Sequence, residues 1–266
     1  MSSFVRDGAR RWCDGGVPAT VVEVTEARGS VPREAGTRMV VAADAVLGTI
    51  GGGHLELQAI HFARERLARG VGDPAEQRLA LGPALGQCCG GAVTLRYAPL
   101  SAAAIAAWPA PAPRFTLQLY GAGHVGRAIA QLLAGIDCRV QWIDERESEF
   151  PQHAEQPPHI ERLCVEPVEA EVRLAPPGAF YLVLTHSHDL DLAITEAILR
   201  RGDFGFLGLI GSQTKRTRFV RRFEQRGIAP AALARLTCPI GLPGIDGKEP
   251  EVIALAVVAQ LLLAAR

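Results

Sequence analysis

The sequence predicts an α/β protein with a Rossmann-like, doubly wound parallel sheet in its C-terminal part and a smaller, mixed, strand-rich N-terminal domain. Three observations support this fold class. Strand-like and helix-like runs alternate through the C-terminal half, a glycine-rich turn joins the first of these strands to the first helix, and an Ala/Pro-rich segment divides the chain. Alternating strands and helices require crossover connections, which place parallel strands between two layers of helices.

The composition is that of a globular protein. The chain has 266 residues, 48% of them hydrophobic, and 28 Lys and Arg residues balance 28 Asp and Glu residues. This balance excludes the basic field that draws proteins to nucleic acids or anionic membranes. The first residues are charged throughout, unlike a secretory leader, and no apolar run approaches the roughly 18 residues of a membrane span. We therefore expect a soluble cytoplasmic protein with neither nucleic-acid nor membrane partners.

The N-terminal domain is expected over residues 1–98. Its first strand is rich in β-branched residues, with Val22 and Val24 on one face and Glu23 on the other. Two short apolar runs then resemble a hairpin or a bulged pair. We expect strands at 18–28, 37–41, 45–50, 77–81 and 92–97, and an amphipathic helix from about 54 to 69.

The segment 99–113 consists mostly of Ala and Pro, carries no charge, and finishes in alternating prolines that favour an extended backbone. We place a domain linker there and the Rossmann-like domain at 114–266. The C-terminal domain is expected to have strands at 115–120, 138–143, 160–163, 179–184 and 204–210, and helices at 124–134, 189–200, 212–226 and 249–264.

A glycine-rich turn in the C-terminal domain predicts a phosphate-bearing ligand. Gly121, Gly123 and Gly126 follow a strand and open a helix that begins near His124, and Asp144 ends the next strand. Glycines permit the tight turn and the close approach of phosphate, the helix N-terminus offers free N–H groups, and the acid stands where a ribose would be bound. A turn that only shapes the fold is the competing interpretation.

Polar residues follow two later strands of the same sheet. His186, His188, Asp189 and Asp191 lie at one strand end, which borders the ligand crevice in an open parallel sheet. The histidines suit phosphate contact, proton transfer or metal ligation, whereas Asp189 suits a helix cap equally well.

Ser212 begins the next helix, which carries Lys215, Arg216 and Arg218. A serine cap beside basic side chains suits a second phosphate, and a capped helix with a solvated basic face is the alternative.

Two N-terminal loops offer a further anion site. Gly52 and Gly53 lead into a helix that begins near His54, and Arg33 and Arg38 flank the preceding turn. An arginine can clamp an anion through two hydrogen bonds, although a tight corner with surface arginines fits the same pattern.

The cysteines do not have the dense, even spacing of a disulfide-stapled domain, and no CxxC pair offers a structural zinc site. Cys88 and Cys89 are adjacent and flanked by glycines, a setting that lets a loop thiolate approach a ligand or a metal closely. The other four are assigned to structure.

Seven motifs in order resemble the XdhC/CoxI family, the xanthine dehydrogenase accessory proteins. They are EARGSVPREAGTRMVV, GTIGGGHLE, GQCCGG, YGAGHVG, THSHDLD, IGSQTKR and CPIGLPGIDGKEPEVIAL. The resemblance covers the chain from about Pro18 to Leu263. The last motif is more similar to the xanthine dehydrogenase branch than to the carbon monoxide dehydrogenase branch.

The resemblance implies a chaperone that binds the molybdenum cofactor in its molybdopterin form and shields it while a cysteine desulfurase supplies the sulfido ligand. The chaperone then delivers the cofactor to the apo molybdenum subunit of xanthine dehydrogenase, and it acts as a homodimer rather than as a turnover enzyme. Cys89 matches the family's Cys-Gly-Gly and is a candidate molybdenum contact, whereas Cys88 departs from that pattern. A separate nucleotide at the glycine turn is a further expectation.

Three other functions fit parts of the sequence. The glycine turn with Asp144 is what an NAD(P)-dependent oxidoreductase would show, although the chain has no evident hydride-transfer acid and base. A metal-dependent hydrolase would use His186, His188, Asp189 and Asp191. A scaffold that binds only protein partners is the fourth possibility.

Overall fold

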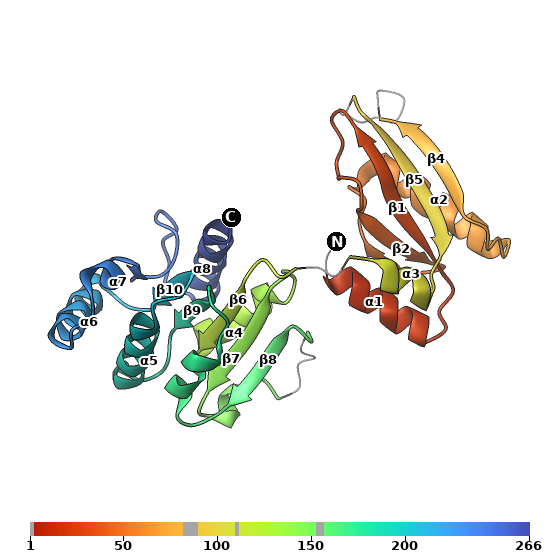
Figure 1. The fold of residues 1–266 in the computed structure, drawn as a ribbon. Coiled ribbons are helices and arrows are strands. Elements are labelled where there is room, and N and C mark those ends of the chain that lie inside the picture. The colour runs from red at the N-terminus through yellow and green to blue at the C-terminus, as the bar shows by residue number, and fades with distance from the viewer. Residues whose placement is uncertain (1–2, 82–89, 110–111, 153–156) are drawn as a thin grey trace. The chain divides into compact units, whose positions relative to one another are not determined.

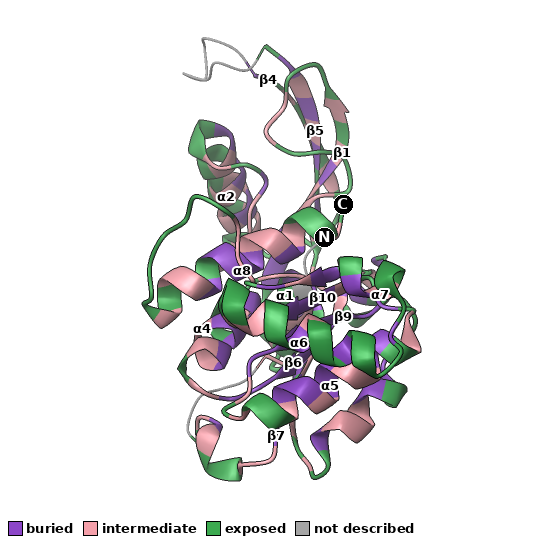
Figure 2. Ribbon diagram, turned by 90° about the vertical axis from the view of Figure 1, so that its left-hand side faces the viewer, coloured by how far each residue is buried: buried purple, intermediate pink, exposed green. Residues whose placement is uncertain are grey.

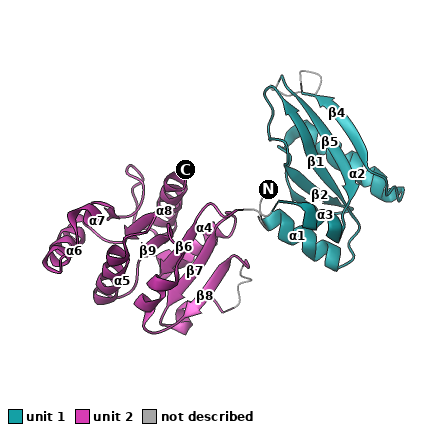
Figure 3. Ribbon diagram, in the orientation of Figure 1, with its two compact units in different colours: residues 1–111 teal, residues 112–266 magenta. Residues whose placement is uncertain are grey.

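The structure is a computed structural model that describes residues 3–81, 90–109, 112–152 and 157–266 (Figure 1). The chain divides into two compact units, residues 1–111 and residues 112–266 (Figure 3). We call them the N-terminal and the C-terminal unit. No helix in the described ranges is long and apolar enough to cross a membrane.

The N-terminal unit is built on a five-stranded antiparallel sheet with the strand order β3-β2-β1-β5-β4. The runs at 37–41 and 45–50 form the predicted hairpin, β2 paired with β3. The strands are β1 Ala19–Arg28, β2 Arg38–Ala42, β3 Val46–Gly48, β4 Ala75–Ala80 and β5 Ala92–Pro99. The helices are α1 Ser3–Asp14, α2 Gly53–Ala68 and α3 Ala102–Ala107.

Helices cover both faces of this sheet (Figure 1). The alternation in β1 directs Val22 and Val24 towards a core that includes Leu55 and Ala59 of α2. Val21 faces a second core, to which α1 contributes Val5 and Ala9 and α3 contributes Ile105. Helix α1 was not among the expected elements.

The segment 99–113, expected to be a linker, contains α3. The Ser101 side chain caps this helix by accepting a 3.1 Å hydrogen bond from the Ala104 amide. Ile105 and Trp108 are buried in the N-terminal unit. Alanine has the highest helix propensity, so the alanines that suggested a linker form a short helix instead. Burial of the Ile105 and Trp108 side chains holds this helix against the N-terminal unit. The division between the units falls between residues 111 and 112.

The C-terminal unit contains a six-stranded parallel sheet with the order β11-β10-β9-β6-β7-β8. Counted from its first strand, this is the 3-2-1-4-5-6 order of a doubly wound Rossmann sheet, so the predicted fold class is confirmed. The order reverses between β6 and β9, where such folds bind ligands. The strands are β6 Thr116–Tyr120, β7 Arg139–Asp144, β8 Ile160–Cys164, β9 Phe180–Val183, β10 Phe206–Leu209 and β11 Leu236–Thr237.

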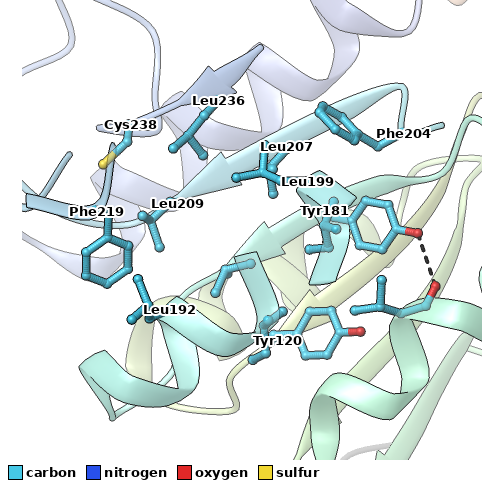
Figure 4. Close-up of a cluster of buried hydrophobic side chains, with 14 of the residues drawn as sticks. Tyr120, Tyr181, Leu192, Leu199, Phe204, Leu207, Leu209, Phe219, Leu236 and Cys238 are labelled. Carbon is cyan, nitrogen blue, oxygen red and sulfur yellow. Dashed lines mark hydrogen bonds between the residues drawn. The ribbon is translucent and has the colours of Figure 1, made fainter. Parts of the chain in front are cut away.

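Two hydrophobic cores flank this sheet, and Figure 4 shows one of them. Helices α4 and α8 pack together over one core, whereas α5 packs with the turn η3 in the other. The helices are α4 His124–Leu133, α5 His188–Arg201, α6 Gln213–Gln225, α7 Pro230–Ala234 and α8 Pro250–Ala264, with 3₁₀ turns η2 Glu147–Glu149 and η3 Val168–Leu174.

One amide side chain is buried within the sheet. Gln118 of β6 is fully buried, and its NH₂ group donates to the Gln141 side chain at 3.0 Å and to the Glu171 carbonyl at 2.8 Å. Its oxygen accepts a 2.8 Å hydrogen bond from the Tyr120 hydroxyl. Gln118 and Gln141 lie directly opposite each other in the paired strands β6 and β7. The side-chain hydrogen bond therefore forms only when the two strands have this alignment.

Candidate functional site

The glycine turn after β6 is tightly packed at two of its three glycines. Gly121 has φ +117°, and a Cβ there would lie 2.3 Å from the Leu184 carbonyl oxygen. A Cβ on Gly126 would lie 2.0 Å from the Gly121 oxygen. Trp142 donates a 3.0 Å hydrogen bond to that same oxygen. The turn therefore touches the chain that follows β9 and holds α4 close to the sheet.

The third glycine is open. Gly123 has no atom within 4 Å of the position that a Cβ would take. It is the N-cap of α4 and, being a glycine, has no side chain that could accept a hydrogen bond from the first amides of the helix. His124 begins the helix and is exposed. An uncapped helix start with open space before it is the arrangement in which phosphates bind.

Asp144 lies at the end of β7, where the sequence predicts a ribose-binding acid, and is 4% exposed. Its Oδ1 accepts from the backbone amide and from Nε of Arg146, both at 3.0 Å. Its Oδ2 accepts from the Ala122 amide at 2.7 Å and from Arg146 Nη2 at 3.0 Å. A carboxylate has about four lone-pair positions, so the protein itself uses all of them.

These contacts also set the charge of Asp144. Burial disfavours the charged form, but the hydrogen bonds from the Arg146 side chain and from the Ala122 amide outweigh burial and hold the pKa below its ordinary value. Arg146 further pairs with Glu149 at 3.5 Å, and Glu149 receives a 2.5 Å contact from Arg127. Arg127 Nε also donates to the Ala122 carbonyl at 2.9 Å. The turn after β6 is thus held by a network of charged side chains.

A cavity of about 310 Å³ opens beside the glycine turn, at the ends of β9 and β10. The structure brings three predicted site residues together in its lining, namely His186, His188 and Ser212. His186 Nε2 also lies 3.6 Å from a carboxylate oxygen of Glu145. The cavity and the glycine turn are adjacent because Gly121 contacts Leu184, which precedes the first lining residue, Thr185.

The cavity wall contains a buried ion pair that the sequence analysis did not recognise. Lys215 Nζ lies 2.5 Å from Asp191 Oδ2 and donates to the Ile210 carbonyl at 2.9 Å. Asp191 also accepts from the Thr185 amide at 3.0 Å and from its hydroxyl at 2.8 Å. The pair spans 24 residues of sequence, so only the sheet order reveals it.

The four residues of the hydrolase interpretation do not gather into a metal site. Asp191 is committed to Lys215 and Thr185. Within the ranges that the structure describes, no group of three or more His, Cys, Asp and Glu side chains is placed to hold a metal ion.

The last sequence motif lines a separate cavity of about 600 Å³. Ile240 and Leu242 from the loop after β11 form part of its wall, together with Arg216 of α6. Gln260 of α8 fixes this loop through two hydrogen bonds to the backbone of Gly241, at 2.9 and 3.2 Å.

Three N-terminal motifs converge at one end of their sheet. A Cβ on Gly91 would lie 2.5 Å from the carbonyl oxygens of Arg28 and Ser30. A Cβ on Gly51 would lie 2.5 Å from the Pro32 side chain. The loop before β2 therefore packs against both the Gly51–Gly53 turn and the glycines that follow the cysteine pair. Cys88 and Cys89 themselves lie outside the described residues.

The amides of the N-terminal glycine turn already bind a carboxylate of this chain. Glu56 Oε2 accepts hydrogen bonds from the Ile50 amide at 3.0 Å and the Gly52 amide at 3.1 Å. It also accepts a hydrogen bond from the Thr49 hydroxyl. The Glu56 carboxylate thus occupies amides of the turn that were expected to bind an external anion.

The basic and imidazole side chains near this turn have separate surroundings. Arg33, Gly53 and His54 are exposed, and the His54 ring lies 3.1 Å from the Gln58 amide nitrogen. Arg38 is paired with Glu23 and lies over the Trp108 ring, so it supports the sheet rather than the turn.

Two buried cysteines have the surroundings expected of structural thiols. Burial raises the pKa of Cys138 to about 12 and also raises the pKa of Cys238. Neither thiol is ionised near neutral pH, so neither is a ready metal ligand.

Comparisons with known proteins agree with this architecture. Residues 117–261 match the family model of the XdhC Rossmann domain, and residues 12–75 match that of the XdhC and CoxI family. The uncharacterized protein YqeB of Escherichia coli K12 is 34% identical over 261 residues, covering 92% of this chain and 43% of YqeB. The chain thus spans less than half the length of that relative.

A crystal structure of a xanthine dehydrogenase from Bacillus halodurans has a similar fold. It superposes with a TM-score of 0.76 at 19% sequence identity, covering 100% of this chain and 97% of that one. At this level of identity the likeness shows the shared fold.

Proposed function

The chain belongs to the XdhC and CoxI family, and on that premise we propose that it is an accessory protein that binds and protects the molybdenum cofactor. It supports sulfuration of the cofactor and delivers it to the apo molybdenum subunit of xanthine dehydrogenase. In this proposal it is a maturation chaperone rather than a turnover enzyme. A cysteine desulfurase and a second copy of this chain complete the proposed partners.

One observation carries the proposal, namely the open start of α4. The pterin part of the cofactor ends in a phosphate, which needs donors and positive potential. Gly123 leaves room before the uncapped amides of α4, and His186, His188 and Ser212 line the adjoining cavity. We propose that the glycine turn holds the phosphate end and that the histidines contact the remainder of the ligand.

The N-terminal unit supplies the second part of the proposal. The loop that carries Arg33 packs both against the turn that leads to Gly52 and His54 and against Gly91, the second glycine after Cys89. We propose that Cys89, which matches the Cys-Gly-Gly of the family, contacts molybdenum as a thiolate. A sulfido ligand on molybdenum is sensitive to oxygen, so a protein that carries it must limit its exposure.

An NAD(P)-dependent oxidoreductase is the second candidate, and the strand order favours it. The adenosine ribose of its dinucleotide would have to donate a hydrogen bond to Asp144, and all four acceptor positions of that carboxylate already serve Ala122 and Arg146. A ligand that brings only a phosphate to this turn requires no displacement of Arg146. The same turn therefore suits the cofactor's phosphate better than a dinucleotide.

The test is anaerobic equilibrium binding of isolated molybdenum cofactor to the full chain. Gly123→Asp adds a carboxylate where the phosphate is proposed, and Gly123→Ala is its control, because a methyl group fits the open space and neither caps the helix amides nor adds a charge. We expect near-stoichiometric binding by wild type and by Gly123→Ala, and weakened binding by Gly123→Asp and by Cys89→Ala. Wild type that binds NAD(P) and not the cofactor would overturn the proposal.

A further inference from the structure

We infer that the cavity between the starts of α5 and α6 is a second oxyanion site, with Lys215 as its central donor. The site takes a compact, doubly charged group such as a phosphate. It adjoins the glycine turn through the contact between Gly121 and Leu184, and its lining includes the two histidines, His186 and His188, that are proposed above to contact the rest of the cofactor. The inference rests on the proposed function only in that both place a ligand at this edge of the sheet.

Lys215 has an unused donor at the cavity. Its side chain is 11% exposed, and its ammonium group donates to Asp191 Oδ2 and to the Ile210 carbonyl. An ammonium group carries three N–H bonds, so one has no oxygen or nitrogen acceptor among the residues that the structure describes, where the Phe219 ring centroid lies 5.4 Å from Nζ. Lys215 lines both the 310 Å³ cavity and an adjoining cavity of about 210 Å³. A ligand oxygen there would complete its hydrogen bonding.

Asp191 fixes Lys215 and does not point a free carboxylate at the ligand. It is 1% exposed, and its Oδ1 is occupied by the amide and hydroxyl of Thr185 while its Oδ2 faces Lys215. The pair holds the ammonium group in place before any ligand arrives. A preset donor avoids the loss of side-chain entropy that weakens most lysine contacts.

Arginines outnumber acids around the adjoining cavity. Arg218 and Arg222 line it together with His188 and Ser212, and Asp189 is the only acid among the described residues of its lining. Neither arginine forms an ion pair with any residue in the described ranges. Both arginines are exposed, and Figure 2 shows that much of α6 is exposed. In a chain with no net charge, these unpaired cations are a local excess.

The size and donor set favour a phosphate over a peptide segment. A volume of about 310 Å³ is at the lower limit of small-ligand sites. Arginine binds tetrahedral oxyanions through two parallel hydrogen bonds, and lysine adds a point charge. Together Lys215 and Arg218 match a group whose several oxygens share two negative charges.

The experiment measures binding of inorganic phosphate and pyrophosphate to the full chain by calorimetry at low ionic strength. It uses Gly123→Asp throughout, so that the glycine turn does not contribute. We expect saturable binding that Arg218→Ala weakens about tenfold. Arg221→Ala is the control, because Arg221 is exposed on the same helix but does not line either cavity. Absence of saturable binding, or equal weakening by Arg221→Ala, would overturn the inference.

Lys215 requires a paired change, because Lys215→Met alone leaves Asp191 buried without its cation. In the double variant Lys215→Met, Asp191→Asn the pair is neutral and Thr185 keeps its acceptor. We expect this variant to fold, as judged by circular dichroism, and to lose phosphate binding. Retained phosphate binding by the folded double variant contradicts the role of Lys215.

The two proposals fail separately. If wild type binds the cofactor but the phosphate titrations are flat, only the second oxyanion site is wrong. If phosphate binds as described and wild type does not bind the cofactor, the second oxyanion site is supported and the proposed chaperone function is wrong.

Discussion

The carboxylate of Asp144 accepts a 2.7 Å hydrogen bond from the Ala122 amide, which ties the end of β7 to the glycine turn after β6. Asp144→Asn removes the charge and at least one of the four hydrogen bonds, and leaves Arg146 without its closest partner. We expect a loss of about 2–4 kcal/mol in unfolding free energy at neutral pH. Urea unfolding of both proteins measures it, and a change below about 0.5 kcal/mol would contradict the role assigned to this contact.

The cost of Asp144→Asn should depend on pH. The folded-state pKa of Asp144 lies below its ordinary 3.8, so the ionised group stabilises the fold above that value. This stabilisation disappears as the pH falls through the lower, folded-state pKa. Wild type and Asp144→Asn should therefore differ most above about pH 4 and converge in more acidic solution. Unfolding series at several pH values test this, and a constant difference would speak against it.

The three glycines of the turn should respond differently to alanine. At Gly121 and Gly126 a Cβ meets backbone oxygens at 2.3 and 2.0 Å, so each substitution should cost about 3 kcal/mol or more. Gly123 has open space and an ordinary φ of −67°, so Gly123→Ala should cost about 1 kcal/mol or less. Thermal unfolding of the three variants ranks them. Comparable losses at all three positions would be inconsistent with the packing described.

The Lys215–Asp191 pair should show strong coupling. Lys215→Met and Asp191→Asn each leave a buried group without its partner, and we expect losses of about 3–5 kcal/mol for each single change. The double variant should lose less than the sum of the two. A double-mutant cycle from denaturant unfolding gives the coupling energy, and additive losses would show that the two side chains do not interact.

Arg146 should determine whether the glycine turn accepts a dinucleotide. Wild type should bind NAD⁺ only weakly, because Asp144 has no free acceptor for the ribose. Arg146→Ala frees two of the four positions and should strengthen NAD⁺ binding about tenfold. Arg139→Ala is the control, because Arg139 is exposed at the start of β7, at the opposite end of that strand from Asp144. Calorimetric titration with NAD⁺ measures these affinities. Tight binding of NAD⁺ by wild type would instead support the oxidoreductase function.

Much of the C-terminal fold could be predicted because its sequence signals are local. The glycine spacing and the apolar run before it predict the turn and α4, and the structure begins that helix at His124. Short elements escaped prediction. The five residues of α7 and the two of β11 are too few to show a periodicity, and their positions depend on packing against α6 and β10.

The contacts at the candidate site were less predictable. Asp144 was placed correctly at a strand end, but its partner Arg146 reads as an ordinary surface residue until the carboxylate geometry is seen. Lys215 stood out only as one of several basic residues in its helix. Its partner Asp191 belongs to another helix, and only the adjacency of β9 and β10 brings the two together.

The buried Gln118–Gln141 contact has a consequence for how the chain folds. Strand β6 is buried on both faces, so burial alone discriminates poorly between neighbouring alignments of β6 and β7. A slip by one residue would break the hydrogen bond between the two amides and leave Gln118 with only Glu171 and Tyr120 as partners, at a cost of about 1 kcal/mol. Misaligned intermediates are thereby disfavoured during assembly of the sheet. Gly121 lies three residues after Gln118. Correct alignment of β6 with β7 therefore also places the glycine turn beside Asp144 at the end of β7.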